Sequence, residues 1–170
     1  MEKVMKSVFK KKEKKFYVSA LDNLNQVELA IGIIMDSSSP STEFSILGKM
    51  NGEEFENKKV LVKKRRELRG YWHSKLNKEV DLGFFSHPEI GYVYIVGPLV
   101  PMFLYKVSGK KLASLSRGVY GILRGFGILP EVTLDFLDKL NKGSYLIILR
   151  DYESEIPQWA IKLDQLHKTG

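Results

Sequence analysis

The chain contains no cysteine. Disulfide bonds, thiolate metal ligands and a cysteine nucleophile are therefore excluded from its structure and chemistry. Because disulfides mark secreted and periplasmic proteins, their absence fits a cytoplasmic location, which is the location that we expect.

A long apolar run is also missing. The longest apolar stretch, residues 90–105, is interrupted by Gly91, Gly97, Pro98 and Pro101. It is well short of the roughly 20 clean apolar residues that span a bilayer. The basic amino terminus, MEKVMKSVFKKKEKKFYV, is followed by no apolar core of a secretory signal. We therefore expect a soluble chain with no transmembrane segment, while contact with a membrane surface stays open.

The common signatures of catalytic and metal sites are absent as well. His73, His87 and His167 are far apart and fit no metal-binding spacing, and there is no Gly-x-Ser-x-Gly elbow. Ser114 and Ser116 have no evident base to activate them. The sequence thus predicts no catalytic residue, no metal site and no cofactor, and it favours a protein that is not an enzyme.

Two glycine-containing segments fall short of nucleotide-binding motifs. GKK at 109–111 opens a predicted helix, but a phosphate loop GxxxxGK[ST] needs glycine at Leu104 and serine or threonine at Lys111. The four glycines of residues 118–127 do not spell GxGxxG, and close packing of a helix is their expected use. A weaker anion site stays open, because a helix start exposes backbone N–H groups. Its candidate residues are Lys110, Lys111, Arg117 and Arg124.

What the chain has in excess is positive charge. Its 27 lysines and arginines against 20 aspartates and glutamates give a formal net charge of +7, and much of the excess lies in residues 10–15 and 58–69. Such clusters favour contact with a polyanion, such as nucleic acid, although a solvated surface rich in lysine and glutamate has the same composition.

The run KKRRELRGYW at 63–72 combines basic residues with adjacent aromatics. Proteins that bind single-stranded nucleic acid use this combination to neutralise phosphates and stack on bases. In the competing interpretation, the aromatics pack this segment onto the domain or form a subunit interface. The candidate residues for nucleic-acid binding are Lys63, Lys64, Arg65, Arg66, Arg69, Tyr71 and Trp72.

The apolar patterns predict a single domain with four strands. The strands are expected at residues 16–20, 43–50, 92–96 and 145–149, and helices at 23–35, 110–126, 130–143 and after Ser154. Asp22 is expected to cap the first helix. The strand YVYIV at 92–96 is apolar throughout, which indicates that both of its faces are covered.

Two segments are interpreted as additions to this core. Residues 1–14 are expected to form a basic arm, and residues 52–90 a basic insertion between the second and third strands. Within the insertion, KVLVK at 59–63 has the alternation of an exposed strand, and the residues after it suit a basic helix broken near Gly70.

The remaining element order is that of the ferredoxin-like, split βαβ arrangement. This α+β fold has a four-stranded antiparallel sheet with helices on one face. A doubly wound parallel sheet is the alternative, and the lack of a glycine-rich turn after the first strand counts against its nucleotide-binding forms.

The carboxy-terminal half carries a resemblance. YVYIVGPLV, a glycine-containing helix and GILPEVTLDFLDKLNKGSYLIIL are similar to a group of uncharacterised bacterial general-stress-type proteins. The resemblance implies a ferredoxin-like domain and no established activity. In that group the glycine-containing stretch is more apolar. This chain departs from the group by its four basic residues in that stretch, which argues against a membrane-embedded role.

These features together predict a non-enzymatic domain that acts through binding or self-association, with a homo-oligomer as one expected form. Two alternatives stay open. The first is single-strand nucleic-acid binding through the basic aromatic segment. The second is a small anionic-ligand domain, or an enzyme, with its site between the sheet and the glycine-containing helix.

Overall fold

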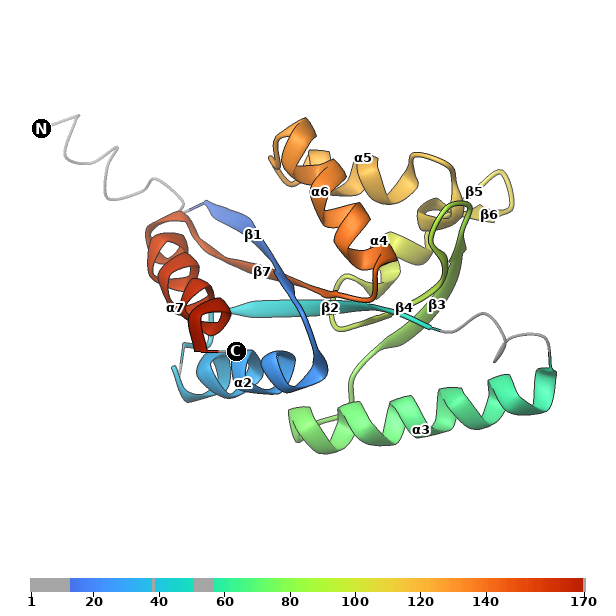
Figure 1. The fold of residues 1–170 in the computed structure, drawn as a ribbon, viewed down its shortest axis with the longest axis horizontal. Helices are drawn as coiled ribbons and strands as arrows, with labels where there is room; N and C mark the ends of the chain where they lie inside the picture. Colours follow the sequence, from blue (N-terminus) through green and yellow to red (C-terminus); the bar gives the residue numbers. More distant parts are fainter. Residues whose placement is uncertain (1–12, 38, 51–56, 170) are drawn as a thin grey trace, which may run out of the picture.

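The computed structural model describes residues 13–37, 39–50 and 57–169 (Figure 1). Most of the expected basic arm, residues 1–12, and the start of the expected insertion, residues 52–56, lie outside the described residues. The strands are β1 (Lys14–Leu21), β2 (Glu43–Lys49), β3 (Leu82–His87), β4 (Gly91–Val96), β5 (Lys106–Val107), β6 (Lys110–Lys111) and β7 (Tyr145–Tyr152). The α-helices are α2 (Leu24–Asp36), α3 (Lys58–Leu76), α4 (Val100–Leu104), α5 (Gly118–Gly125), α6 (Pro130–Asn141) and α7 (Ile156–Thr169).

Five of these strands form one antiparallel sheet in the order β1-β7-β2-β4-β3, and β5 and β6 form a separate two-stranded hairpin. The central strand, β2, pairs Leu47 with both Ile95 of β4 and Leu146 of β7. Each helical connection between strands of the large sheet skips one strand. β7 lies between β1 and β2, β4 between β2 and β3, and β2 between β4 and β7.

Helices cover both faces of this sheet (Figure 1). Alternate residues of β7 show why, because Ile147 and Leu149 belong to the core under α2, α3 and α7, while Leu146 and Ile148 belong to the core under α4, α5 and α6. Each such side chain contributes about 1.5–3 kcal/mol when it is fully buried, so neither face can be left open to water. The predicted four-stranded sheet with helices on one face is therefore wrong in both respects, since the sheet has five strands and two covered faces.

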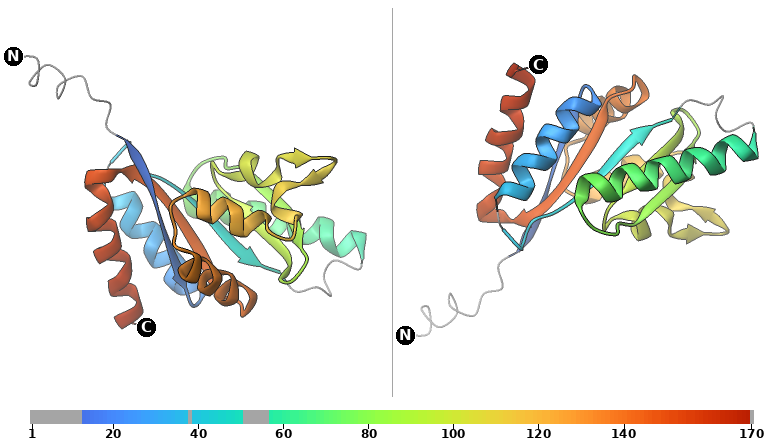
Figure 2. Two further views of the ribbon diagram at one scale, coloured as in Figure 1. Left: turned by 90° about the horizontal axis from the view of Figure 1, so that it is seen from above. Right: turned by 90° about the horizontal axis from the view of Figure 1, so that it is seen from below.

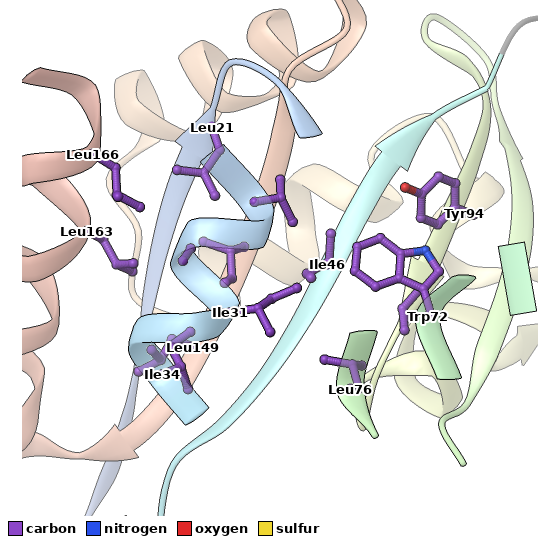
Figure 3. Close-up of a cluster of buried hydrophobic side chains, with 14 of the residues drawn as sticks. Leu21, Ile31, Ile34, Ile46, Trp72, Leu76, Tyr94, Leu149, Leu163 and Leu166 are labelled. Atoms are coloured by element: carbon purple, nitrogen blue, oxygen red, sulfur yellow. The ribbon is translucent and has the colours of Figure 1, made fainter. Parts of the chain in front are cut away.

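The core beneath α2, α3 and α7 contains the two tryptophans of the chain, Trp72 and Trp159, both almost fully buried. Trp72 extends from α3 toward the sheet beside Tyr94, with Ile46 and Leu76 nearby (Figure 3). The ring centroids of Trp72 and Tyr94 lie 6.3 Å apart. α3 is thus anchored to the sheet by the carboxy-terminal third of its length.

The segment expected to be an insertion supplies both a long helix and an edge strand. KVLVK lies inside α3 and not in a strand, since Asn57 caps the helix by accepting a hydrogen bond from the Lys59 N–H at 2.9 Å. β3 then pairs with β4 along its whole length. The prediction of a strand at KVLVK is wrong because five residues can match the alternation of a strand by chance inside a run of good helix formers.

The predicted helix at 110–126 is broken into shorter elements. Ser108 and Gly109 adopt positive φ angles of 51° and 81°, which reverse the chain between β5 and β6. A 3-10 turn at Leu112–Ser114 follows, and α5 begins only at Gly118. At the first helix, Asn23 and not Asp22 is the cap, and its side chain accepts from the Gln26 N–H at 2.9 Å. Within the described part of the chain, every helix is too short or too polar to cross a membrane.

Candidate ligand-binding site

The three glycines of α5 have different structural roles. A Cβ on Gly118 would lie 1.8 Å from the carbonyl oxygen of Leu112, so only glycine lets α5 begin against the preceding 3-10 turn. A Cβ on Gly121 or Gly125 would meet no atom within 4 Å. Close packing, the use expected for all of them, therefore holds at Gly118 and not at the other two.

Gly121 and Gly125 lie one helical turn apart on the exposed side of α5, while Val119 and Leu123 are buried beneath the helix. Residues four apart share a helical face, so the two missing side chains leave a continuous stretch of bare helix backbone. This stretch is one wall of a groove of about 1040 Å³.

The groove follows α5 from end to end, a length of about 12 Å at 1.5 Å per residue. At the carboxy-terminal end of the helix, Phe126 stacks on Phe16 of β1 with ring centroids 3.9 Å apart and an interplanar angle of 18°. Met102 of α4 and Leu112 contribute apolar surface from the segments before α5. Volume and lining are those of a small-molecule site, which is apolar with few polar groups.

Positive charge gathers toward the start of α5. Arg117 directly precedes the helix and Lys110 comes from β6, and both line the groove together with the hydroxyl-bearing Ser114 and Ser116. No side chain caps α5, so its first backbone N–H groups add the positive end of a helix dipole. Among the described residues that line the groove there is no carboxylate, so nothing there neutralises the two cations.

The four residues predicted to bind an anion are only partly brought together. Lys110 and Arg117 line the groove. The Lys111 amine instead donates to the carbonyl oxygen of Phe84 at 2.6 Å. Arg124 donates to the carbonyl oxygen of Ile128 at 2.7 Å and thereby closes the turn after α5. Two of the four thus remain candidates for contact with a ligand.

The apolar surface and the cationic groups of the groove suit ligand binding, but the described residues of its lining include no acid–base pair. Its polar lining consists of serine hydroxyls and cationic groups, and the described residues that line it include no imidazole or carboxylate to activate Ser114 or Ser116. No group of three or more His, Asp or Glu side chains in the described residues is placed to hold a metal ion.

The residues predicted to bind nucleic acid differ in exposure. Lys63, Arg65, Arg66 and Arg69 are exposed on α3, and Lys64 is half-buried. Tyr71 donates a hydrogen bond from its hydroxyl to the Glu28 carboxylate at 2.5 Å. Partial burial, together with this carboxylate, raises the pKa of Tyr71.

Trp72 has no exposed surface. It therefore cannot stack on a base, and it packs α3 onto the sheet, as the competing interpretation of this segment held.

A buried carboxylate that the sequence did not single out lies at the end of β7. Asp151 accepts hydrogen bonds from Ser41 Oγ (2.8 Å), Thr42 Oγ1 (2.7 Å), Trp159 Nε1 (2.8 Å) and the Tyr152 N–H (2.7 Å). Burial alone would raise the pKa of Asp151, but these hydrogen bonds together lower it. Every donor comes from the chain itself, so Asp151 joins β7, α7 and the loop before β2 and is a structural anchor.

Comparison of the chain with protein-family models, with curated proteins and with solved structures yields no match. The resemblance to general-stress-type proteins therefore stays a prediction. The groove also includes residues with no local signal in the sequence. Phe16 and Met102, for example, look like ordinary strand and loop residues until the fold brings them to α5.

Proposed function

We propose that this chain is a non-catalytic binding domain whose groove along α5 takes a small amphipathic anion, such as a fatty carboxylate. The observation that carries the proposal is the pairing of an apolar groove, kept open by Gly121 and Gly125, with two cations near one end and no described carboxylate in the lining. An apolar body fills the space over the glycines, and an anionic head group meets Arg117 and Lys110.

The energetics support this division of the ligand. Apolar surface contributes about 25 cal/mol for each Å² removed from water, so affinity grows with the length of chain laid along α5. A hydrogen bond to a charged group adds about 1.5–3 kcal/mol, which favours a carboxylate over a neutral head group by roughly tenfold to a hundredfold.

We also propose that the fold is a variant of the ferredoxin-like arrangement. β2, α3, β3, β4, the helices α4 to α6, and β7 follow the β-α-β-β-α-β order, and each crossover leaves one strand between the strands it joins. The chain differs by its added β1 and α2 and by the position of α4 to α6 on the face opposite α3. The groove lies on this second face.

Calorimetric titration with dodecanoate and with dodecanol tests the proposal, because the two ligands share an alkyl chain and differ in charge. We expect dodecanoate to bind roughly tenfold to a hundredfold more tightly. Arg117→Gln should remove most of that difference and leave dodecanol binding unchanged, since only the carboxylate contacts the guanidinium.

Gly121→Leu supplies the steric test. The new side chain enters the groove, where no atom opposes it, so both ligands should lose binding while the helix gains roughly 0.7 kcal/mol from better propensity. Gly32→Leu in α2 is the matched control, because a side chain at Gly32 also meets no atom within 4 Å and lies outside the groove. It should leave binding intact.

Unchanged binding by Gly121→Leu, or no binding of either ligand to the native chain, would overturn the proposal. Sedimentation of the native chain and of Gly121→Leu tests whether the groove is instead a contact between subunits. If the substitution dissociates an oligomer and no ligand binds, then the groove is a subunit contact.

A further inference from the structure

Two basic segments that are far apart in the sequence, residues 58–69 and 105–111, both contact the edge strand β3. α3 passes one side of β3 and the β5–β6 hairpin passes the other, and both project at the same end of the molecule (Figures 1 and 2). The Arg65 guanidinium lies 4.8 Å from the centroid of the Phe84 ring, and the Lys111 amine is 2.6 Å from the carbonyl oxygen of the same residue. We call residues 58–69 and 105–111 together the basic end.

The charge of the basic end is one-sided. Residues 58–69 contain seven lysines and arginines and one glutamate, and residues 105–111 add three lysines and no acidic residue. Among the described residues, neither Arg65 nor Lys106 forms an ion pair. Burial and the charges of Arg65 and Lys106 lower the pKa of Lys111. Arg65, Lys106 and Lys111 therefore repel one another.

Apolar side chains are exposed among these cations. Val60 and Val62 of α3 are 42% and 54% exposed, and Tyr105 and Val107 of the hairpin are 67% and 41% exposed. All four lie within the projecting segments and contribute nothing to either core. A surface that mixes exposed apolar groups with an excess of cations matches an environment that is both anionic and partly apolar.

We propose that the basic end docks on the surface of an anionic phospholipid bilayer. Its lysines and arginines contact lipid phosphates, Val62 and Val107 enter the boundary between head groups and acyl chains, and Tyr105 takes the interfacial position that tyrosine favours. Nucleic acid fits less well, because a phosphate backbone makes no favourable contact with exposed valines. In addition, Trp72 is buried and cannot stack on a base.

Docking does not depend on the groove having a ligand, but the two sites are neighbours. Lys110 belongs both to the hairpin and to the lining of the groove. The cationic part of the groove is therefore close to the docked surface.

Flotation with vesicles of phosphatidylcholine, with and without phosphatidylglycerol, tests the inference on the full chain. We expect binding to the anionic vesicles alone, weakening as salt is added. Arg65→Gln with Lys106→Gln removes one cation from each segment and should lower the affinity roughly 25-fold, at about fivefold for each charge near the surface. None of the residues changed in this test lines the groove, so dodecanoate binding is unaffected if both sites are as proposed.

Val62→Ser with Val107→Ser provides the discriminating variant. It leaves the charge unchanged, so a bilayer partner predicts about a tenfold loss of vesicle binding from lost apolar burial, whereas a purely electrostatic partner predicts no loss. Lys139→Gln with Lys142→Gln is the charge-matched control, because both amines already pair with carboxylates at 2.9 Å and 2.8 Å. It should bind vesicles normally, and thermal melts verify that each variant folds.

Two results would overturn the inference. One is the absence of binding to anionic vesicles at low salt. The other is vesicle binding that the valine variant leaves unchanged, together with tighter binding to single-stranded DNA, which would assign the basic end to nucleic acid.

Discussion

Alanine placed at two glycines of one short helix should change stability in opposite directions. The positions are Gly118 and Gly121, three residues apart in α5. The substitution adds the same methyl group in both cases, and neither glycine has a positive φ. Backbone strain is thus excluded, and any difference in sign comes from what surrounds the new Cβ.

The surroundings set the two magnitudes. At Gly121 the Cβ meets no atom within 4 Å, so alanine contributes its helix propensity of about 1 kcal/mol relative to glycine. A chain of this size then melts roughly 2–4 °C higher. At Gly118 the Cβ falls 1.8 Å from the oxygen and 2.8 Å from the carbon of the Leu112 carbonyl. These backbone atoms cannot rotate away, and overpacking of this kind costs about 1–3 kcal/mol.

Thermal and urea unfolding of the two variants and of the native chain measure these differences directly. Gly32→Ala in α2 is the reference for an open helical glycine, and it should stabilise the chain as Gly121→Ala does. If Gly118→Ala also stabilises the chain, then the 3-10 turn yields to the helix and the assignment of Gly118 to close packing fails. If Gly121→Ala destabilises, the space over that glycine is not open.

Three further outcomes are expected from buried side chains. Asp151→Asn should cost about 2–4 kcal/mol of stability, because an amide cannot satisfy four donors as a carboxylate does. Since the pKa of Asp151 is lowered in the folded chain, urea titrations should show the native chain losing stability as pH falls below about 4. The variant should lose less stability over the same pH range. His87 accepts hydrogen bonds from two backbone N–H groups through Nδ1, and burial lowers its pKa. The stability of the native chain should therefore also fall as pH drops below about 6.5. His87→Gln should remove this loss of stability, and a loss that persists in the variant would refute its assignment to His87. Trp72→Ala should lower the free energy of unfolding in urea by about 3–5 kcal/mol. Arg66→Ala, at an exposed position, is the control and should change stability by less than about 0.5 kcal/mol. Equal effects of the two substitutions would contradict a core role for Trp72.

The elements with strong periodicity could be predicted from the sequence. The helix expected at 23–35 is α2, Leu24–Asp36, and the strands expected around YVYIV and YLIIL are β4 and β7. These elements carry their signal locally, as an apolar stripe or a continuous apolar run. The hairpin at 106–111 carries none, because its reversal depends on the φ angles of Ser108 and Gly109 in a segment that also suits a helix.

The apolar strands of the sequence already indicate how many layers the fold has. A strand that is apolar at every position needs cover on both faces, and YVYIV met that condition. A sheet with helices on one face leaves half of those side chains in water. The composition of β4 and β7 therefore favoured the three-layer arrangement over the two-layer one, whatever the order of the elements suggested.

The candidate groove depends on an absence that only a folded chain can reveal. In the sequence, Gly118, Gly121 and Gly125 form one cluster with one apparent purpose, yet they differ once the neighbours of each Cβ are known. Gly118 has a structural reason to be glycine. Gly121 has none among the described residues, although glycine at that position costs α5 about 1 kcal/mol. An occupant of the groove would supply the missing reason, and this is why filling that space with Gly121→Leu is the most direct test of function that the chain offers.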